Sequence, residues 1–156
     1  MERLLSARMI PAMIRRYRRR HQHVVFTNGV FDILHRGHVQ YLARAKSLGD
    51  VLIVGLNSDT SARRLKGKGR PFQRQEDRAA VLLALRAVDY VVIFGEDTPD
   101  KLIRTIRPDV LVKGADYQAA EIVGATFVRS YGGRVRRIRL TPGRSTSKIL
   151  ARLGHA

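Results

Sequence analysis

The chain contains no cysteine and no tryptophan, and its aromatic share is only 6%. The lack of cysteine excludes disulfides, thiolate nucleophiles and cysteine-ligated zinc, and it fits a reducing compartment. No apolar run approaches the roughly 20 residues that a membrane-spanning helix requires. Acidic residues are also scarce, with 13 Asp and Glu against 30 Lys and Arg. The net charge of +17 therefore indicates nucleic acid, anionic small molecules or a solvated basic surface.

Residues 1–22 form a basic segment that holds seven of the arginines and a single acid, Glu2. Apolar side chains recur in this segment at helical spacing, at Met9, Ile10, Met13, Ile14 and Tyr17. The stripe predicts a short helix that packs on the rest of the domain. A polyanion-binding arm and a targeting segment are the alternatives that the charge leaves open.

The remainder, residues 23–156, alternates apolar runs with helical patterns. Strands are expected at residues 23–27, 51–57, 90–94, 109–112 and 135–140. Helices are expected near residues 37–48, 59–65, 75–87, 99–106, 118–131 and 146–153. The middle strands are nearly continuous Val, Leu and Ile, which is typical of parallel strands covered on both faces. The sequence thus predicts an α/β fold, a single Rossmann-like domain with about five parallel strands and helices on both faces.

The segment after the first expected strand is the strongest candidate site, because ligands of such sheets bind beyond the carboxyl ends of the strands. It reads Thr27-Asn28-Gly29-Val30-Phe31-Asp32-Ile33-Leu34-His35-Arg36-Gly37-His38. Gly29 allows a ligand to approach the backbone closely, and Gly37 lies where a helix N-terminus favours phosphate. His35 and His38 can donate hydrogen bonds to charge that develops on a phosphoryl group. Taken alone, this spacing also suits two structural histidines.

Two further segments carry polar clusters. Residues 145–147, Ser-Thr-Ser, stand at an expected helix start beside Arg144, where they would cradle a polyphosphate tail or only cap the helix. Lys113 and Asp116 follow the fourth expected strand at the functional edge of the sheet, where a simple turn is the alternative. Residues 63–78 form a basic loop that would clamp an anion or remain solvated.

The string G-x-F-D-x-x-H-x-G-H at residues 29–38 resembles the signature of the nucleotidylyltransferase superfamily. Residues 143–149 resemble the superfamily's second motif, as found in glycerol-phosphate cytidylyltransferases. The strings V-K-G-x-D-Y at residues 112–117 and T-N-G-x-F-D-x-L-H at residues 27–35 resemble bacterial heptose-1-phosphate adenylyltransferases, either stand-alone or as half of a bifunctional kinase–adenylyltransferase. The resemblance runs from about residue 24 to residue 153.

This resemblance implies that the domain transfers AMP from ATP to D-glycero-D-manno-heptose 1-phosphate, giving ADP-heptose for lipopolysaccharide and releasing pyrophosphate. A sugar-phosphate oxygen would attack the α-phosphate in line, so no protein nucleophile is required. The resemblance assigns catalysis to His35, His38 and Lys66. The residues that it places at the nucleotide are Thr27, Asn28, Gly29, Val30, Phe31, Gly37, Arg78, Arg144, Ser145, Thr146 and Ser147. Those that it places at the sugar phosphate are Asp32, Asn57, Lys113, Gly114, Asp116 and Tyr117.

The resemblance further implies a Mg²⁺ ion held mainly by the triphosphate, with Asp32 either near the ion or bonded to a His or Lys. It implies a cytoplasmic homodimer that takes two small-molecule substrates, without a membrane or a specific nucleic-acid partner. Glycerol-3-phosphate cytidylyltransferase and FMN adenylyltransferase activities are the alternatives within the superfamily. Leu140 stands where the cytidylyltransferase motif has an arginine, which disfavours the first of them. A non-enzymatic, basic nucleic-acid-binding module is the alternative of another class.

Overall fold

The computed structural model describes residues 3–118, 121–139, 141 and 146–154. Its elements follow the chain in the order β1 (Leu4–Leu5), α1 (Ile10–Arg19), β2 (Val24–Gly29), α2 (Arg36–Lys46), β3 (Val51–Asn57), α3 (Asp59–Lys66), α4 (Gln75–Ala84), β4 (Tyr90–Phe94), α5 (Asp100–Ile106), β5 (Val110–Gly114), α6 (Ala125–Ser130), β6 (Arg134–Ile138) and α7 (Thr146–Arg152). Among these described helices, none has the length and apolar character needed to cross a membrane.

The strands form one parallel sheet in the order β1-β4-β3-β2-β5-β6, which confirms the predicted α/β fold. The strand order reverses between β2 and β5, and this reversal creates the crevice in which such sheets bind ligands. The sheet has one strand more than the five that were expected. This additional strand is β1, which pairs with β4 through Leu4 and Val91. Sequence patterns did not predict it, because two residues are too few to show strand periodicity.

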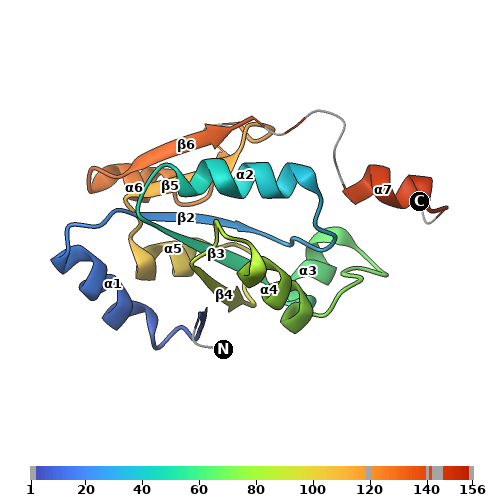
Figure 1. The fold of residues 1–156 in the computed structure, drawn as a ribbon, viewed down its shortest axis with the longest axis horizontal. Coiled ribbons are helices and arrows are strands. Elements are labelled where there is room, and N and C mark those ends of the chain that lie inside the picture. Colours follow the sequence, from blue (N-terminus) through green and yellow to red (C-terminus); the bar gives the residue numbers. More distant parts are fainter. Residues whose placement is uncertain (1–2, 119–120, 140, 142–145, 155–156) are drawn as a thin grey trace.

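Helices cover both faces of the sheet (Figure 1). Buried side chains of α1, α5 and α6 form one apolar cluster with the sheet, and those of α2 and α4 form the other. Every residue of β3 is buried, since the strand lies between the two clusters. This position explains why the β3 sequence is a continuous run of apolar residues, since both faces of the strand are covered.

The basic N-terminal segment packs on the domain through α1, as the apolar stripe predicts. Ile10 and Ile14 are buried, and the hydroxyls of Tyr17 and Tyr90 lie 2.7 Å apart. Arg18 Nη2 donates to the carbonyl oxygen of Arg107 at 3.1 Å, which ties α1 to the end of α5. Most of the other arginines of this segment point to solvent.

The largest departure from the expected elements lies before α6. A helix was predicted over residues 118–131, but α6 begins only at Ala125. Gly124 precedes it with a φ of +82°, a left-handed conformation that interrupts a helix and favours glycine. Residues 115–118 and 121–124 therefore belong to no long helix, and they lie between the carboxyl end of β5 and the start of α6.

Candidate active site

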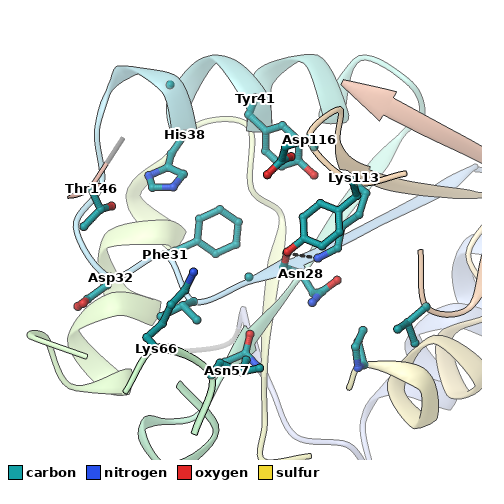
Figure 2. A pocket seen from close by; sticks show the side chains of 18 of the residues that line it. Asn28, Phe31, Asp32, His38, Tyr41, Asn57, Lys66, Lys113, Asp116 and Thr146 are labelled. Carbon is teal, nitrogen blue, oxygen red and sulfur yellow. Dashed lines mark hydrogen bonds between the residues drawn. The ribbon is translucent and has the colours of Figure 1, made fainter. Parts of the chain in front are cut away.

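A cavity of about 630 Å³ opens at the strand-order reversal, and α2, α3, β5 and α7 all contribute side chains to it (Figure 2). The predicted site residues that line it are Asn28, Gly29, Val30, Phe31, Asp32, His35, Gly37, His38, Asn57, Lys66, Lys113, Gly114, Asp116, Tyr117, Thr146 and Ser147. These residues are far apart in the sequence, so the fold alone brings them together. Arg144 and Ser145 lie outside the described residues.

The two histidines meet at the start of α2. Nδ1 of His35 accepts a hydrogen bond from the backbone N–H of Gly37 at 3.1 Å, so His35 caps the helix. This bond requires Nδ1 of His35 to be unprotonated, which leaves Nε2 as the donor of the neutral ring. The rings of His35 and His38 stack with centroids 3.9 Å apart. Burial lowers the pKa of His35, and burial together with the charge of His35 lowers the pKa of His38 to about 4. Both imidazoles are thus neutral at pH 7.

Phe31 fixes the position of His38 from the side. The edge of one ring meets the face of the other at a centroid distance of 5.3 Å. Phe31 has a φ of +46°, a left-handed conformation that is rare for an aromatic residue and is concentrated at functional sites. A Cβ on Gly29 would lie 3.0 Å from the Phe31 ring, so glycine at that position makes room for the ring.

Two lysines supply positive charge to the cavity, Lys66 from the end of α3 and Lys113 from β5 (Figure 2). Nζ of Lys113 lies 3.4 Å from the carbonyl oxygen of Asn28 and 4.7 Å from the centre of the Tyr117 ring. Burial lowers the pKa of Lys113 to about 8, and the charge of Lys66 adds to this effect while Asp116 opposes it. A bound phosphate would reverse the shift, because it stabilises the protonated amine.

Asp32 holds the basic loop against the H-x-G-H segment. Its buried carboxylate accepts from Arg70 Nε at 2.8 Å and from the backbone N–H groups of Phe72 and Gln73 at 2.9 and 3.1 Å. Of the alternatives weighed from the sequence, this arrangement matches neither a metal ligand nor a partner of His or Lys. The carboxylate instead orders residues 70–73 at the rim of the cavity.

Two residues expected at the nucleotide are not among the described residues that line the cavity. Thr27 is fully buried, and its hydroxyl lies 2.7 Å from that of Tyr41. Arg78 is also buried, and its guanidinium forms hydrogen bonds and an ion pair with other residues of the protein. It donates to the carbonyl oxygens of Val30, Asn57 and Gln73 and pairs with Asp59 at 2.7 Å. Arg78 therefore joins the segments behind the cavity wall.

Helix α7 approaches the site from the far end of the chain. Oγ1 of Thr146 donates to the carbonyl oxygen of Ile33 at 3.2 Å, which connects α7 to the segment before the histidines. Ser147 lies beside it on the cavity wall. The motifs at residues 29–38 and 143–149, about 110 residues apart in the sequence, are therefore in contact through Thr146 and Ile33.

The cavity also contains residues that sequence reasoning did not assign to it: Tyr41, Leu65, Arg70, Asp97, Thr98, Pro99, Leu111, Glu121, Ile122, Val123 and Thr141. Tyr41 follows His38 by three residues on α2, so helical spacing could have indicated it. Asp97, Thr98 and Pro99 follow β4, whose carboxyl end lies at the same edge of the sheet. Ile122 and Val123 fall within the helix expected over residues 118–131, so no sequence signal pointed to their place in the cavity wall.

Comparisons with known proteins agree with this geometry. A model of the family described as cytidylyltransferase-like matches residues 26–151. The bifunctional protein HldE of Wolinella succinogenes is 56% identical over 152 residues, 97% of this chain and 31% of that protein. HldE of Syntrophotalea carbinolica is 58% identical over 136 residues, 87% of this chain and 28% of that protein. The chain thus spans about three-tenths of the length of these curated relatives.

Solved structures show the same fold. A lipopolysaccharide core biosynthesis protein from Thermoplasma volcanium matches with a TM-score of 0.64 at 31% identity, over 77% of this chain and 97% of that one. A pantoate-beta-alanine ligase from Francisella tularensis matches with a TM-score of 0.62 over 92% of this chain and 68% of that one, but at 16% identity it shows the fold alone. Because the family model spans most of the sequence and the site is built from its motifs, the chain belongs to the cytidylyltransferase-like family.

Proposed function

We propose that this chain transfers AMP from ATP to a sugar 1-phosphate, specifically D-glycero-D-manno-heptose 1-phosphate, and releases pyrophosphate. The observation that carries the proposal is the stacked pair of neutral histidines at the start of α2, in a cavity that also holds Lys66 and Lys113. Neutral imidazoles are hydrogen-bond donors that do not have to exchange a proton, and they suit phosphoryl charge that grows and then disperses.

In this mechanism an oxygen of the sugar phosphate attacks the α-phosphorus of the triphosphate. The bond from the α-phosphorus to the bridging oxygen breaks, and pyrophosphate leaves on the opposite side. His35, with Nε2, and His38 donate to the α-phosphate oxygens in the transition state. Lys66 and Lys113 balance the charge of the two anionic substrates and hold them in line.

The family resemblance also implies Mg²⁺, and the residues present do not make a site for it. No group of three or more His, Cys, Asp or Glu in the described part of the chain could hold a metal ion. The carboxylate of Asp32 is already engaged by Arg70 and two backbone N–H groups. We therefore assign Mg²⁺ to the triphosphate.

The choice of heptose phosphate and ATP rests on the comparisons. This chain matches about three-tenths of the length of relatives that are named bifunctional. Such partial coverage is expected if the chain corresponds to the adenylyltransferase part of a kinase–adenylyltransferase. A lipopolysaccharide core biosynthesis protein among the similar structures points to the same class of product. The proposal includes a cytoplasmic site of action, where ATP is available, and a homodimer, which light scattering on the purified chain would test.

A pyrophosphate-release assay tests the proposal. The purified chain is supplied with each of the four nucleoside triphosphates and with heptose 1-phosphate, glycerol 3-phosphate and FMN in turn, and His38→Ala serves as the inactive control. We expect release with ATP and heptose 1-phosphate alone. Release with CTP and glycerol 3-phosphate, or with ATP and FMN, would assign the chain to another activity of the superfamily. No release with any pair would favour the nucleic-acid-binding module.

A further inference from the structure

A second cavity, of about 420 Å³, is lined by residues of α6 and β6. The strand β6 forms the outer edge of the sheet (Figure 1). Its lining is Ala115, Ile122, Arg129, Val135, Arg136, Arg137 and Arg139. Ile122 also lines the first cavity, and Ala115 lies between its wall residues Gly114 and Asp116. The two cavities therefore share a wall, but the second contains none of the histidines or lysines of the proposed active site.

Four of the seven lining residues are arginines, and no acid lies among them. Within the part of the chain that the structure describes, none of these four guanidiniums pairs with a carboxylate. Arg137 donates to the carbonyl oxygen of Tyr117 at 3.2 Å, so its remaining N–H groups are available. Glu121 is the nearest acid along the chain to Ile122, and its carboxylate accepts from the backbone N–H of Gln118.

Like charges that line one hollow repel each other, and a concave wall focuses their positive potential. The planar guanidinium presents paired donors that match the oxygens of a phosphate group. Because side chains alternate between the faces of a strand, Arg137 lies on the same face of β6 as Val135, and Arg136 lies on the opposite face. Because β6 is an edge strand, charged side chains on it also discourage pairing with other chains. That protective role requires neither a cavity nor Arg129, which belongs to α6.

We propose that the cavity lined by Arg129, Arg137 and Arg139, here called the arginine cavity, is a second anion site that binds a small polyphosphate. The volume accommodates a ligand of the size of a di- or triphosphate, and the arginines in the lining favour a strongly charged one. The site is distinct from the cavity that holds the proposed reaction.

Calorimetric titration with inorganic pyrophosphate at low ionic strength tests this site, using the full chain. The test variant is Arg129→Gln/Arg137→Gln. The matched control is Arg15→Gln/Arg19→Gln, which makes the same charge change on exposed positions of α1. Thermal unfolding followed by circular dichroism checks that both variants fold.

We expect the test variant to lose one pyrophosphate site of the wild-type protein, or to bind there about 100-fold more weakly, since each guanidinium removed costs roughly tenfold. The control should keep the wild-type isotherm. If the first cavity does not bind pyrophosphate, the wild type has one site instead of two, and that site should still disappear in the test variant. This outcome would count against the proposed function and leave the arginine cavity supported.

Three results would overturn the proposal. An unchanged isotherm in the test variant would show that the arginine cavity is not a pyrophosphate site. If pyrophosphate binding weakened equally in the control variant, the effect would come from the change in net charge alone, an attraction that salt screens at any surface. Loss of oligonucleotide binding in a mobility assay, with pyrophosphate binding intact, would make the cavity part of a nucleic-acid surface instead.

Discussion

The imidazole rings of His35 and His38 stack at an interplanar angle of 26° with their centroids 3.9 Å apart. Two charged rings at this distance would repel, and burial together with the neighbouring ring keeps the pKa of His38 at about 4. Nδ1 of His38 is buried and has no hydrogen-bond partner in the described part of the chain. The fold thus accepts an unsatisfied polar atom in order to keep a neutral ring at the start of α2, which favours function over stability at this position.

Replacing His38 with alanine should lower kcat by 100-fold or more, about 3 kcal/mol, because the transition state loses one preorganised donor. The KM for ATP should change much less, since the donor acts mainly on charge that develops during transfer. Steady-state kinetics with a pyrophosphate readout measure both constants. His23→Ala is the matched control, because the His23 side chain is 60% exposed and is absent from the cavity lining. A His38→Ala protein with near-normal kcat would remove His38 from the mechanism.

The low pKa of His38 also predicts how stability depends on pH. An unfolded histidine titrates near 6.5, whereas His38 in the folded protein titrates at about 4. Between these values the unfolded state binds more protons, so the free energy of unfolding should fall as pH decreases from 6.5 to 4 and then level off. His38→Gln removes this contribution, which is about 3 kcal/mol at most. Urea unfolding at several pH values measures it, and equal pH dependence in both proteins would contradict a neutral, half-buried His38.

Lys113 predicts a pH effect on substrate capture at the opposite end of the range. Its pKa of about 8 in the free protein means that the amine is charged below pH 8 and loses its proton above it. The kcat/KM for the sugar phosphate, which reports the free enzyme, should therefore fall as pH rises through 8. Lys113→Arg stays charged, so the fall near pH 8 should disappear, while Lys113→Met should give low values throughout. If the kcat/KM of the wild-type protein stayed constant from pH 7 to 9, Lys113 would not be a residue that binds the sugar phosphate.

The sequence predicted those parts of the site that depend on short-range order. The spacing of His35 and His38 fixes both on one end of a helix, and Gly29 and Gly37 mark a close backbone approach. Residues 51–57 and 90–94 are strands as predicted, since continuous apolar runs leave little choice for strands that are covered on both faces. These features can be predicted because each depends on neighbours only a few residues away.

The features that sequence reasoning missed depend on contacts between distant segments. Asp32 contacts a loop 38 to 41 residues further along the chain, and no local pattern shows that this loop folds back on it. The arginine cavity likewise combines α6 and β6 residues whose local pattern resembles an ordinary solvated strand and helix. Their surroundings follow from tertiary packing, which periodicity does not encode.

Arg78 offers a test that separates support of the site from contact with the ligand. Its side chain is fully buried and donates to the carbonyl oxygens of Val30 and Asn57 at 2.6 and 2.9 Å. Arg78→Met would leave these acceptors and Asp59 without their partner, so the free energy of unfolding should fall by about 3 to 5 kcal/mol. The exposed Arg63 on α3 provides the control, because Arg63→Met removes the same charge without a buried partner. Urea unfolding measures the stability of each protein, and ATP titration below the transition measures affinity. Wild-type stability combined with weakened ATP binding would instead place Arg78 at the nucleotide, as the family resemblance implied.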